Sequence, residues 1–107
     1  MAYQQQYVEA TLSRDEVDQM QGPVLLEFGT NWCGHCSAVA PRLEAMLKHR
    51  ADFPHIKVED GPGKPLGRSF RVKLWPTLVF MRDGQVVSQV SRPDDSQIRD
   101  GLAAMGV

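Results

Sequence analysis

The sequence predicts an α/β protein: a single domain, residues 1–107, in which helices cover both faces of one mixed β-sheet. Its length suits one compact domain with one core. The elements begin as strand, helix, strand and end as a strand pair followed by a helix, an order typical of a mixed sheet. Hydrophobic residues make up 42% of the chain and charged residues 23%, which is ordinary globular usage and argues against disorder.

The charge balance and the amino terminus exclude several classes of function. Twelve basic and thirteen acidic residues give a formal charge of −1, so the chain lacks the basic bias of a nucleic-acid binder. The opening MAYQQQYVEA has no apolar run typical of a signal peptide, and no stretch approaches the roughly 18 apolar residues that span a membrane. We therefore expect a cytoplasmic monomer, although a periplasmic or secreted chain trimmed of its leader would begin in the same way.

The first elements come before the first apolar run. The pattern allows an opening strand at Tyr7–Ala10. Ser13 and Glu16 then form the S-x-x-E pattern of a capping box, which predicts a short helix from about Arg14 to Gln21. Gly22-Pro23 should end this helix.

A buried strand and a long helix should follow. VLLEF (Val24–Phe28) is an apolar run of strand length that suits a central strand covered on both faces, and it makes Glu27 conspicuous. Between about Cys33 and Arg50, apolar residues recur at helical spacing. Pro41 lies inside this pattern, so we expect a kink there rather than an end.

The second half should contain a strand, a short helix, a hairpin and a last helix. The hairpin is the clearest signal, because Arg82-Asp83-Gly84, with its Asp-Gly pair, separates the apolar runs PTLVFM and QVVSQV. Asp94 and Gln97 begin the last helix with a capping pattern. The strand is expected at His55–Asp60 and the short helix around Leu66–Phe70, after a loop rich in glycine and proline.

The only two cysteines, Cys33 and Cys36, stand in NWCGHC where the first strand gives way to the long helix. Residues three apart on a helix have Cβ atoms roughly 5–6 Å apart, close to disulfide range. At the helix N-terminus the free N–H groups and the dipole favour a thiolate, so the pKa of Cys33 should fall below its usual value of about 8.5. Cys33 would then attack a disulfide, and the more protected Cys36 would resolve the mixed disulfide.

Other roles for the two thiols were weighed against this one. Cys33, His35 and Cys36 offer three metal ligands, but a closed zinc site needs four, usually from two half-sites. His49 and His55 stand alone in the sequence. Metal handling, a purely structural disulfide and a non-catalytic binding module therefore remain as alternatives, and no metal or other cofactor is expected.

Three stretches together resemble the thioredoxin superfamily over nearly the whole chain: VLLEFGTNWCGHC, APRLEAM and WPTLVFMRDGQVV. The resemblance implies a thioredoxin fold and a thiol–disulfide oxidoreductase acting on protein disulfides. Cys33 would be its nucleophile and Cys36 its resolving thiol, joined in the redox disulfide. A reductase or an oxidant would recycle the pair, with no nucleic acid or membrane as partner.

The resemblance also assigns roles to Glu27 and Pro76. Glu27 falls where the family has a buried acid, usually Asp. Burial near Cys36 would raise the pKa of this carboxyl group and let it exchange a proton with the thiol. Pro76 matches the family's cis-proline, which exposes the preceding backbone to a substrate strand. The expected substrate-binding set is Trp32, Gly34, Trp75, Pro76 and Thr77.

Several positions depart from the thioredoxin pattern, among them Trp75, His35 and Ser91. His35 stands where thioredoxins typically have Pro, and Gly-His is the pair found in protein disulfide isomerases. An imidazole near Cys33 would stabilise the thiolate and make the disulfide more oxidising, so His35 joins the expected catalytic residues. Ser91 lies where the family usually has Gly near the substrate groove.

Overall fold

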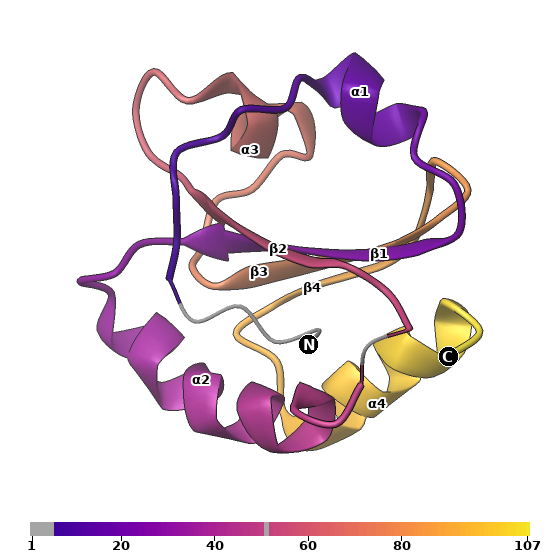
Figure 1. Cartoon of the computed structure of the whole chain (residues 1–107). Helices are drawn as coiled ribbons and strands as arrows, with labels where there is room; N and C mark the ends of the chain where they lie inside the picture. Colours follow the sequence, from indigo (N-terminus) through magenta and orange to yellow (C-terminus); the bar gives the residue numbers. More distant parts are fainter. Residues whose placement is uncertain (1–5, 51) are drawn as a thin grey trace.

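The computed structural model describes residues 6–50 and 52–107. Eight elements follow one another in the predicted order of helices and strands (Figure 1). They are α1 (Arg14–Asp18), β1 (Pro23–Gly29), α2 (Gly34–Leu47), β2 (His55–Glu59), α3 (Pro65–Ser69), β3 (Thr77–Arg82), β4 (Gln85–Ser91) and α4 (Asp95–Ala104).

The four strands form one mixed sheet in the order β2-β1-β3-β4. β1 pairs in parallel with β2 and antiparallel with β3, and β4 closes the sheet beside β3. In this register Glu27 of β1 lies opposite Lys57 of β2 and Leu78 of β3. The predicted buried acid is therefore on a central strand, with polar neighbours supplied by the β2 edge.

Two hydrophobic clusters lie on opposite faces of the sheet. One joins Leu25 and Phe80 to the buried faces of α2 and α4. The other joins Leu26, Phe28 and Val79 to α1 and α3. Figure 1 shows the same layering, with α1 and α3 on one side of the strands and α2 and α4 on the other. Alternate residues of β1 face opposite layers, so Glu27 faces the layer of α2, as Leu25 does.

The segment before α1 is less regular than expected. The strand predicted at Tyr7–Ala10 does not form, and an isolated bridge between Val8 and Val58 takes its place. Val8 donates to the Lys57 carbonyl at 3.2 Å, and its own carbonyl accepts from Glu59 at 2.8 Å. This segment therefore lies along the free edge of β2 and brings Tyr7 beside the sheet.

The capping patterns were predicted correctly at both helices. Ser13 and Glu16 exchange side-chain and backbone hydrogen bonds at the start of α1, and Asp94 and Gln97 do the same at α4. α1 ends at Asp18, earlier than predicted. α2 continues through Pro41 to Leu47, so this proline does not end the helix.

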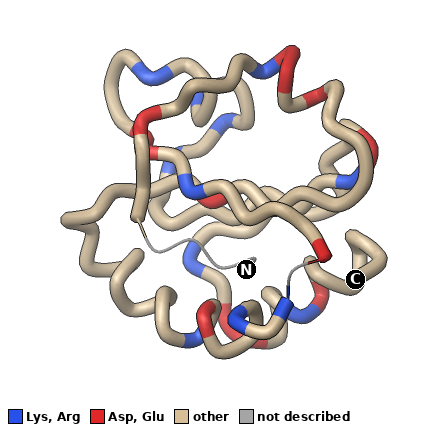
Figure 2. Tube along the Cα trace, viewed as in Figure 1, with Lys and Arg blue, Asp and Glu red and all other residues tan. Residues whose placement is uncertain are grey.

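Charged residues are dispersed along the chain. Figure 2 shows Lys and Arg interspersed with Asp and Glu along most of the trace. Of the helices in the described part of the chain, none has the length and apolar character needed to cross a membrane.

Candidate active site

The two cysteines lie at the connection between β1 and the start of α2, and both are free thiols. Cys33 is the N-cap of α2, and its sulfur accepts a hydrogen bond from the Cys36 N–H at 3.2 Å. This N–H is one of the free donors in the first helical turn, and it favours negative charge on the Cys33 sulfur. The Cys33 Sγ also lies 4.0 Å from the Trp75 carbonyl oxygen. Cys33 is 9% exposed and Cys36 is 3% exposed, so both thiols sit just below the surface.

The inner thiol holds its proton strongly. Burial raises the pKa of Cys36 to about 11, and the hydrogen bond with Cys33 raises it in the same direction. The Thr30 backbone and the Tyr7 hydroxyl lower it and only partly offset the burial. At neutral pH Cys36 is therefore a protonated thiol that must lose its proton before it can attack.

Glu27 is buried as predicted, at 1% exposure, and both of its carboxylate oxygens have partners. His55 Nε2 lies 2.9 Å from Oε1, and both side chains are buried. The Tyr7 hydroxyl donates a hydrogen bond to Oε2. An ionised carboxylate only accepts, so His55 must donate from Nε2 whenever Glu27 is charged.

Tyr7 is the residue that the sequence analysis missed. Its hydroxyl donates to Glu27, and Tyr7 packs with Cys36 in one buried cluster, so it lies between the predicted acid and the predicted resolving thiol. Asn31 holds the Tyr7 backbone on both sides, accepting from its N–H at 2.9 Å and donating to its carbonyl at 3.0 Å. The Lys57 ammonium lies 4.2 Å from the centre of the Tyr7 ring, in cation–π range.

Gly29 makes this arrangement sterically feasible. A Cβ at Gly29 would lie 2.6 Å from the Cys36 sulfur and 2.9 Å from the Tyr7 hydroxyl oxygen. Both distances are well inside van der Waals contact. The missing side chain therefore leaves the room in which the thiol and the phenol meet at the end of β1.

The predicted tryptophan pair forms a wall beside the dithiol. Trp32 is 77% exposed, and its ring meets that of Trp75 edge-to-face with centroids 5.7 Å apart. The Trp75 indole N–H donates to Asp60 at 2.9 Å, which fixes the second ring. The Trp75–Pro76 peptide bond is cis. These contacts gather Trp32, Trp75 and Pro76 around Cys33.

Internal hydrogen bonds of Thr77 and Arg92 hold the loop around Pro76 in place. Thr77 is fully buried, and its hydroxyl contacts the Leu74 carbonyl and the Ser91 hydroxyl. These contacts orient the loop that carries Pro76, and the assignment of Thr77 to the substrate-binding set stays a prediction. Ser91 stands where the family usually has Gly, and the residue after it, Arg92, has a positive φ of 50°. The Arg92 Nε donates to the Trp75 carbonyl at 3.0 Å.

Gly34 and His35 form the exposed first turn of α2, between the two cysteines. This places the imidazole on the solvent side of the dithiol. Among the described residues, His, Cys, Asp and Glu nowhere gather in threes that could hold a metal ion.

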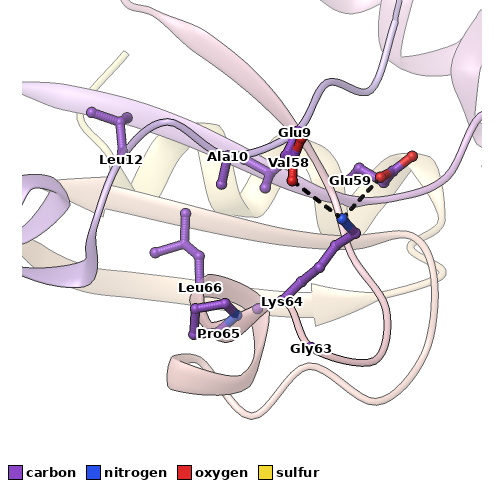
Figure 3. A pocket seen from close by; sticks show the side chains of 10 residues that line it. Glu9, Ala10, Leu12, Val58, Glu59, Gly63, Lys64, Pro65 and Leu66 are labelled. Carbon is purple, nitrogen blue, oxygen red and sulfur yellow. Dashed lines mark ion pairs between the residues drawn. The ribbon is translucent and has the colours of Figure 1, made fainter.

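Two surface hollows lie in this part of the molecule, and only one of them borders the dithiol. One, of about 210 Å³, has Tyr7, Cys36 and Lys57 among its lining residues and so borders the thiol network. Another, of about 130 Å³, lies between the segment before α1, the end of β2 and α3 (Figure 3). Lys64 crosses the second hollow to Glu59 at 3.1 Å and to Glu9 at 3.9 Å. Neither cysteine lines it.

Comparison with known proteins places this site in context. The family model described as thioredoxin matches residues 5–104. The reduced form of thioredoxin 2 from Pseudomonas aeruginosa PAO1 is 47% identical, with a TM-score of 0.83, covering 97% of this chain and 98% of that one. A thioredoxin f2 solved in complex with ferredoxin:thioredoxin reductase shares the fold at 20% identity, with a TM-score of 0.77 and coverage of 95% and 94%.

Two curated relatives align over shorter stretches. The thioredoxin of Mycobacterium tuberculosis is 39% identical over 69 residues, which are 64% of this chain. The alignment spans only 60% of that relative's length. Protein disulfide-isomerase A2 of Pongo abelii is 42% identical over 65 residues, covering 57% of this chain and 12% of that protein.

Proposed function

The chain belongs to the thioredoxin family, and from this premise we propose that it is an oxidoreductase that exchanges disulfides with protein substrates through Cys33 and Cys36. The observation that carries the proposal is the unequal pair of sulfurs at the start of α2. The outer sulfur accepts an N–H from the first helical turn, whereas the inner one is a buried, protonated thiol. Thiol–disulfide exchange needs such a nucleophile and such a resolving group.

The reaction begins at Cys33. Its thiolate attacks one sulfur of a substrate disulfide, forming a Cys33–substrate bond while the substrate S–S bond breaks. The other substrate sulfur leaves with the electron pair as a thiolate. Cys36 then attacks the Cys33 sulfur, the intramolecular disulfide forms, and the second substrate sulfur is released. The substrate gains two electrons and the dithiol loses them.

The groove suits an extended peptide as substrate. The exposed Trp32 ring and the partly exposed Trp75 provide an apolar wall, and the Pro76 segment runs past Cys33. Main-chain pairing along such a segment gives affinity with little demand on sequence. Continued turnover requires a protein partner that exchanges electrons with the disulfide, and we place this cycle in the cytoplasm, where a reductase would return the dithiol.

Insulin reduction driven by dithiothreitol tests the activity. Cys33→Ser should abolish catalysis because no nucleophile remains. Cys36→Ser should accumulate a mixed disulfide on Cys33, visible in the intact mass under non-reducing conditions. Retention of wild-type activity by Cys33→Ser would exclude the assigned nucleophile. Stoichiometric zinc retained by the reduced protein after purification would instead favour metal handling.

His35 is proposed to set the direction of electron flow. Its exposed imidazole lies on the turn that joins the two cysteines, where positive charge favours the thiolate form. Stabilising the reduced state makes a couple more oxidising, and roughly 30 mV corresponds to a tenfold change in the equilibrium constant. His35→Pro should therefore shift the equilibrium with glutathione toward a more reducing potential. An unchanged potential would remove His35 from the catalytic set.

A further inference from the structure

The inner thiol poses a problem that the exchange reaction must solve. Cys36 is buried and carries a proton at neutral pH, yet only its thiolate can displace the substrate from Cys33. A proton acceptor must therefore reach the Cys36 sulfur inside the protein. Glu27 supplies a carboxylate nearby, but its Oε2 already accepts from the Tyr7 hydroxyl and its Oε1 faces His55.

We propose that the Tyr7 hydroxyl relays the Cys36 proton to Glu27 during the resolving step. A phenol has one hydrogen and two acceptor lone pairs. When Tyr7 donates that hydrogen to Glu27, its oxygen is free to accept from the Cys36 S–H. The hydroxyl donates to Glu27, and its oxygen and the Cys36 sulfur lie beside the same side-chain-free space at Gly29. The thiol, the phenol and the carboxylate are therefore placed to form one continuous hydrogen-bonded chain. The inference rests on the disulfide exchange proposed above.

The relay balances atoms and electrons. The S–H proton of Cys36 moves to the Tyr7 oxygen as the Tyr7 proton moves to Oε2 of Glu27. The sulfur electron pair forms the bond to Cys33, and the Cys33–substrate bond breaks toward the substrate. The substrate leaves as a thiolate that takes a proton from water. Tyr7 ends as a neutral phenol, Glu27 as a carboxylic acid, and the dithiol as a disulfide.

Surrounding groups suit Tyr7 for passing a proton rather than for losing one. Burial raises the pKa of Tyr7 well above its usual value, and the neighbouring Glu27 adds to the effect, so a free tyrosinate does not accumulate. Lys57 lies over the ring and His55 contacts the far oxygen of Glu27. The Asn31 clamp fixes the Tyr7 backbone, which sets the position of the phenol.

Tyr7→Phe tests the relay, because it keeps the ring and removes only the hydroxyl. The reduced protein is mixed with the chromogenic reagent dithiobis-nitrobenzoate in a stopped-flow instrument. Each thiol step releases one coloured thiolate: the first reports attack by Cys33 and the second reports resolution by Cys36. Since positioned acid–base groups typically contribute roughly 100-fold or more, the second phase should slow by at least about tenfold. The first phase should stay within about twofold, since Cys33 keeps its N–H partner.

The pH dependence separates a relay from a packing defect. Cys36 is faced by Cys33 and Tyr7, and Tyr7 in turn contacts Glu27 and Lys57, with His55 on the far oxygen of Glu27. Only the phenol is altered. In Tyr7→Phe the second phase should accelerate about tenfold per pH unit toward a pH of about 11, because hydroxide then removes the proton directly. In the wild-type protein the rate of the second phase should depend less on pH. Its rate should also fall along a curve, not a straight line, as the deuterium fraction of the solvent rises, because two protons move in the step.

Gly29→Ala provides a second variant that retains every hydrogen-bonding group. Its added methyl lies in the space shared by the Cys36 sulfur and the Tyr7 hydroxyl, so it should separate them and slow the second phase as well. Gly22→Ala at the opposite end of β1 is the matched control, since a methyl there meets no atom within 4 Å. Circular dichroism establishes that each variant is folded.

Each outcome decides between distinct conclusions. A normal second phase in folded Tyr7→Phe would overturn the relay and leave the disulfide exchange intact. Equal slowing of both phases with an unchanged pH profile would assign Tyr7 to packing, which also overturns the relay. Loss of the first phase in the wild-type protein would instead overturn the proposed function itself.

Discussion

Arg92 joins a strained backbone to a polar contact in the substrate groove. Its φ of 50° lies in the left-handed region that favours glycine, which costs a non-glycine residue about 1–2 kcal/mol. Its guanidinium meanwhile holds the Trp75 carbonyl, the group that precedes Pro76 beside Cys33. The side chain therefore stabilises the loop while its backbone opposes the same conformation.

Comparing two substitutions at Arg92 separates these effects. Arg92→Gly and Arg92→Ala both remove the guanidinium, but only glycine relieves the backbone. The glycine variant should therefore be more stable than the alanine variant by about 1 kcal/mol, against the usual order of these residues. Urea unfolding of both proteins gives the difference. A more stable alanine variant would mean that the loop relaxes out of the left-handed region.

Single residues were predictable where local chemistry marked them. Cys33 and Cys36 stand out by spacing, and Glu27 stands out because it interrupts an apolar strand. Tyr7 gave no such signal: its partner Glu27 is twenty residues away, and their contact depends on the β2 edge and on the empty space at Gly29. The residues around Tyr7 in the sequence are polar and do not indicate that its side chain contacts a buried carboxylate.

The β3–β4 hairpin is fixed by its own turn and by the loop before β1. Asp83 and Gly84 both have positive φ, as the two-residue turn requires. The Asp83 carboxylate accepts from Gly22 N–H at 2.7 Å, and its N–H donates to the Gly22 carbonyl at 3.0 Å. A Cβ at Gly84 would lie 2.0 Å from the Asp18 carbonyl oxygen, so the hairpin tip packs directly against the end of α1.

Gly84→Ala should therefore destabilise the fold more than a backbone effect alone. Gly22→Ala is the matched control, because Gly22 has nearly the same positive φ but open space around its Cα. The control should lose about 1 kcal/mol, and Gly84→Ala about 1–3 kcal/mol more because of the clash. Urea unfolding measures both. Equal losses would mean that the hairpin tip moves away from α1 at little cost.

Elements were predictable wherever their ends are set by nearby residues. The capping boxes at Ser13 and Asp94 and the turn at Asp83-Gly84 act over three or four residues, so the sequence reveals them directly. The opening strand was wrong because strand formation needs a partner, and β2 offers Val8 only a single bridge. The positive φ at Arg92 gave no signal in the sequence, because no pattern of residue types there marks a left-handed backbone.

At the scale of the whole molecule, one sheet serves two hydrophobic layers. β1 and β3 contribute side chains to both, so neither layer can lose its packing without affecting the strands shared with the other. Small domains built in this way usually unfold in a single cooperative step. Both tryptophans lie at the dithiol, so their fluorescence reports on one end of the molecule only.

Leu43→Ala and Leu66→Ala test this cooperativity from opposite sides of the sheet. Each leucine is buried in a different layer, and each truncation should lower the free energy of unfolding by about 2–5 kcal/mol. Fluorescence and far-ultraviolet circular dichroism should still give one coincident urea transition. Exposed Arg99→Ala is the control, expected within about 0.5 kcal/mol of wild type. Separate transitions for the two probes would show that the layers unfold independently.

The segment that carries Tyr7 lies at the edge of the sheet, where contacts of the Tyr7 side chain with Glu27 and Lys57 help to hold it. Two backbone hydrogen bonds at Val8 and two contacts with Asn31 hold it to the margin of the sheet. Segments at the edge of a sheet open locally far more often than the whole domain unfolds. Each opening would expose the Cys36 sulfur to water, which could then take its proton directly and bypass Tyr7 and Glu27. The hydrogen bonds of Asn31 thereby help to determine how often Cys36 is exposed to water. Amide hydrogen exchange at Val8 would measure how often the segment opens.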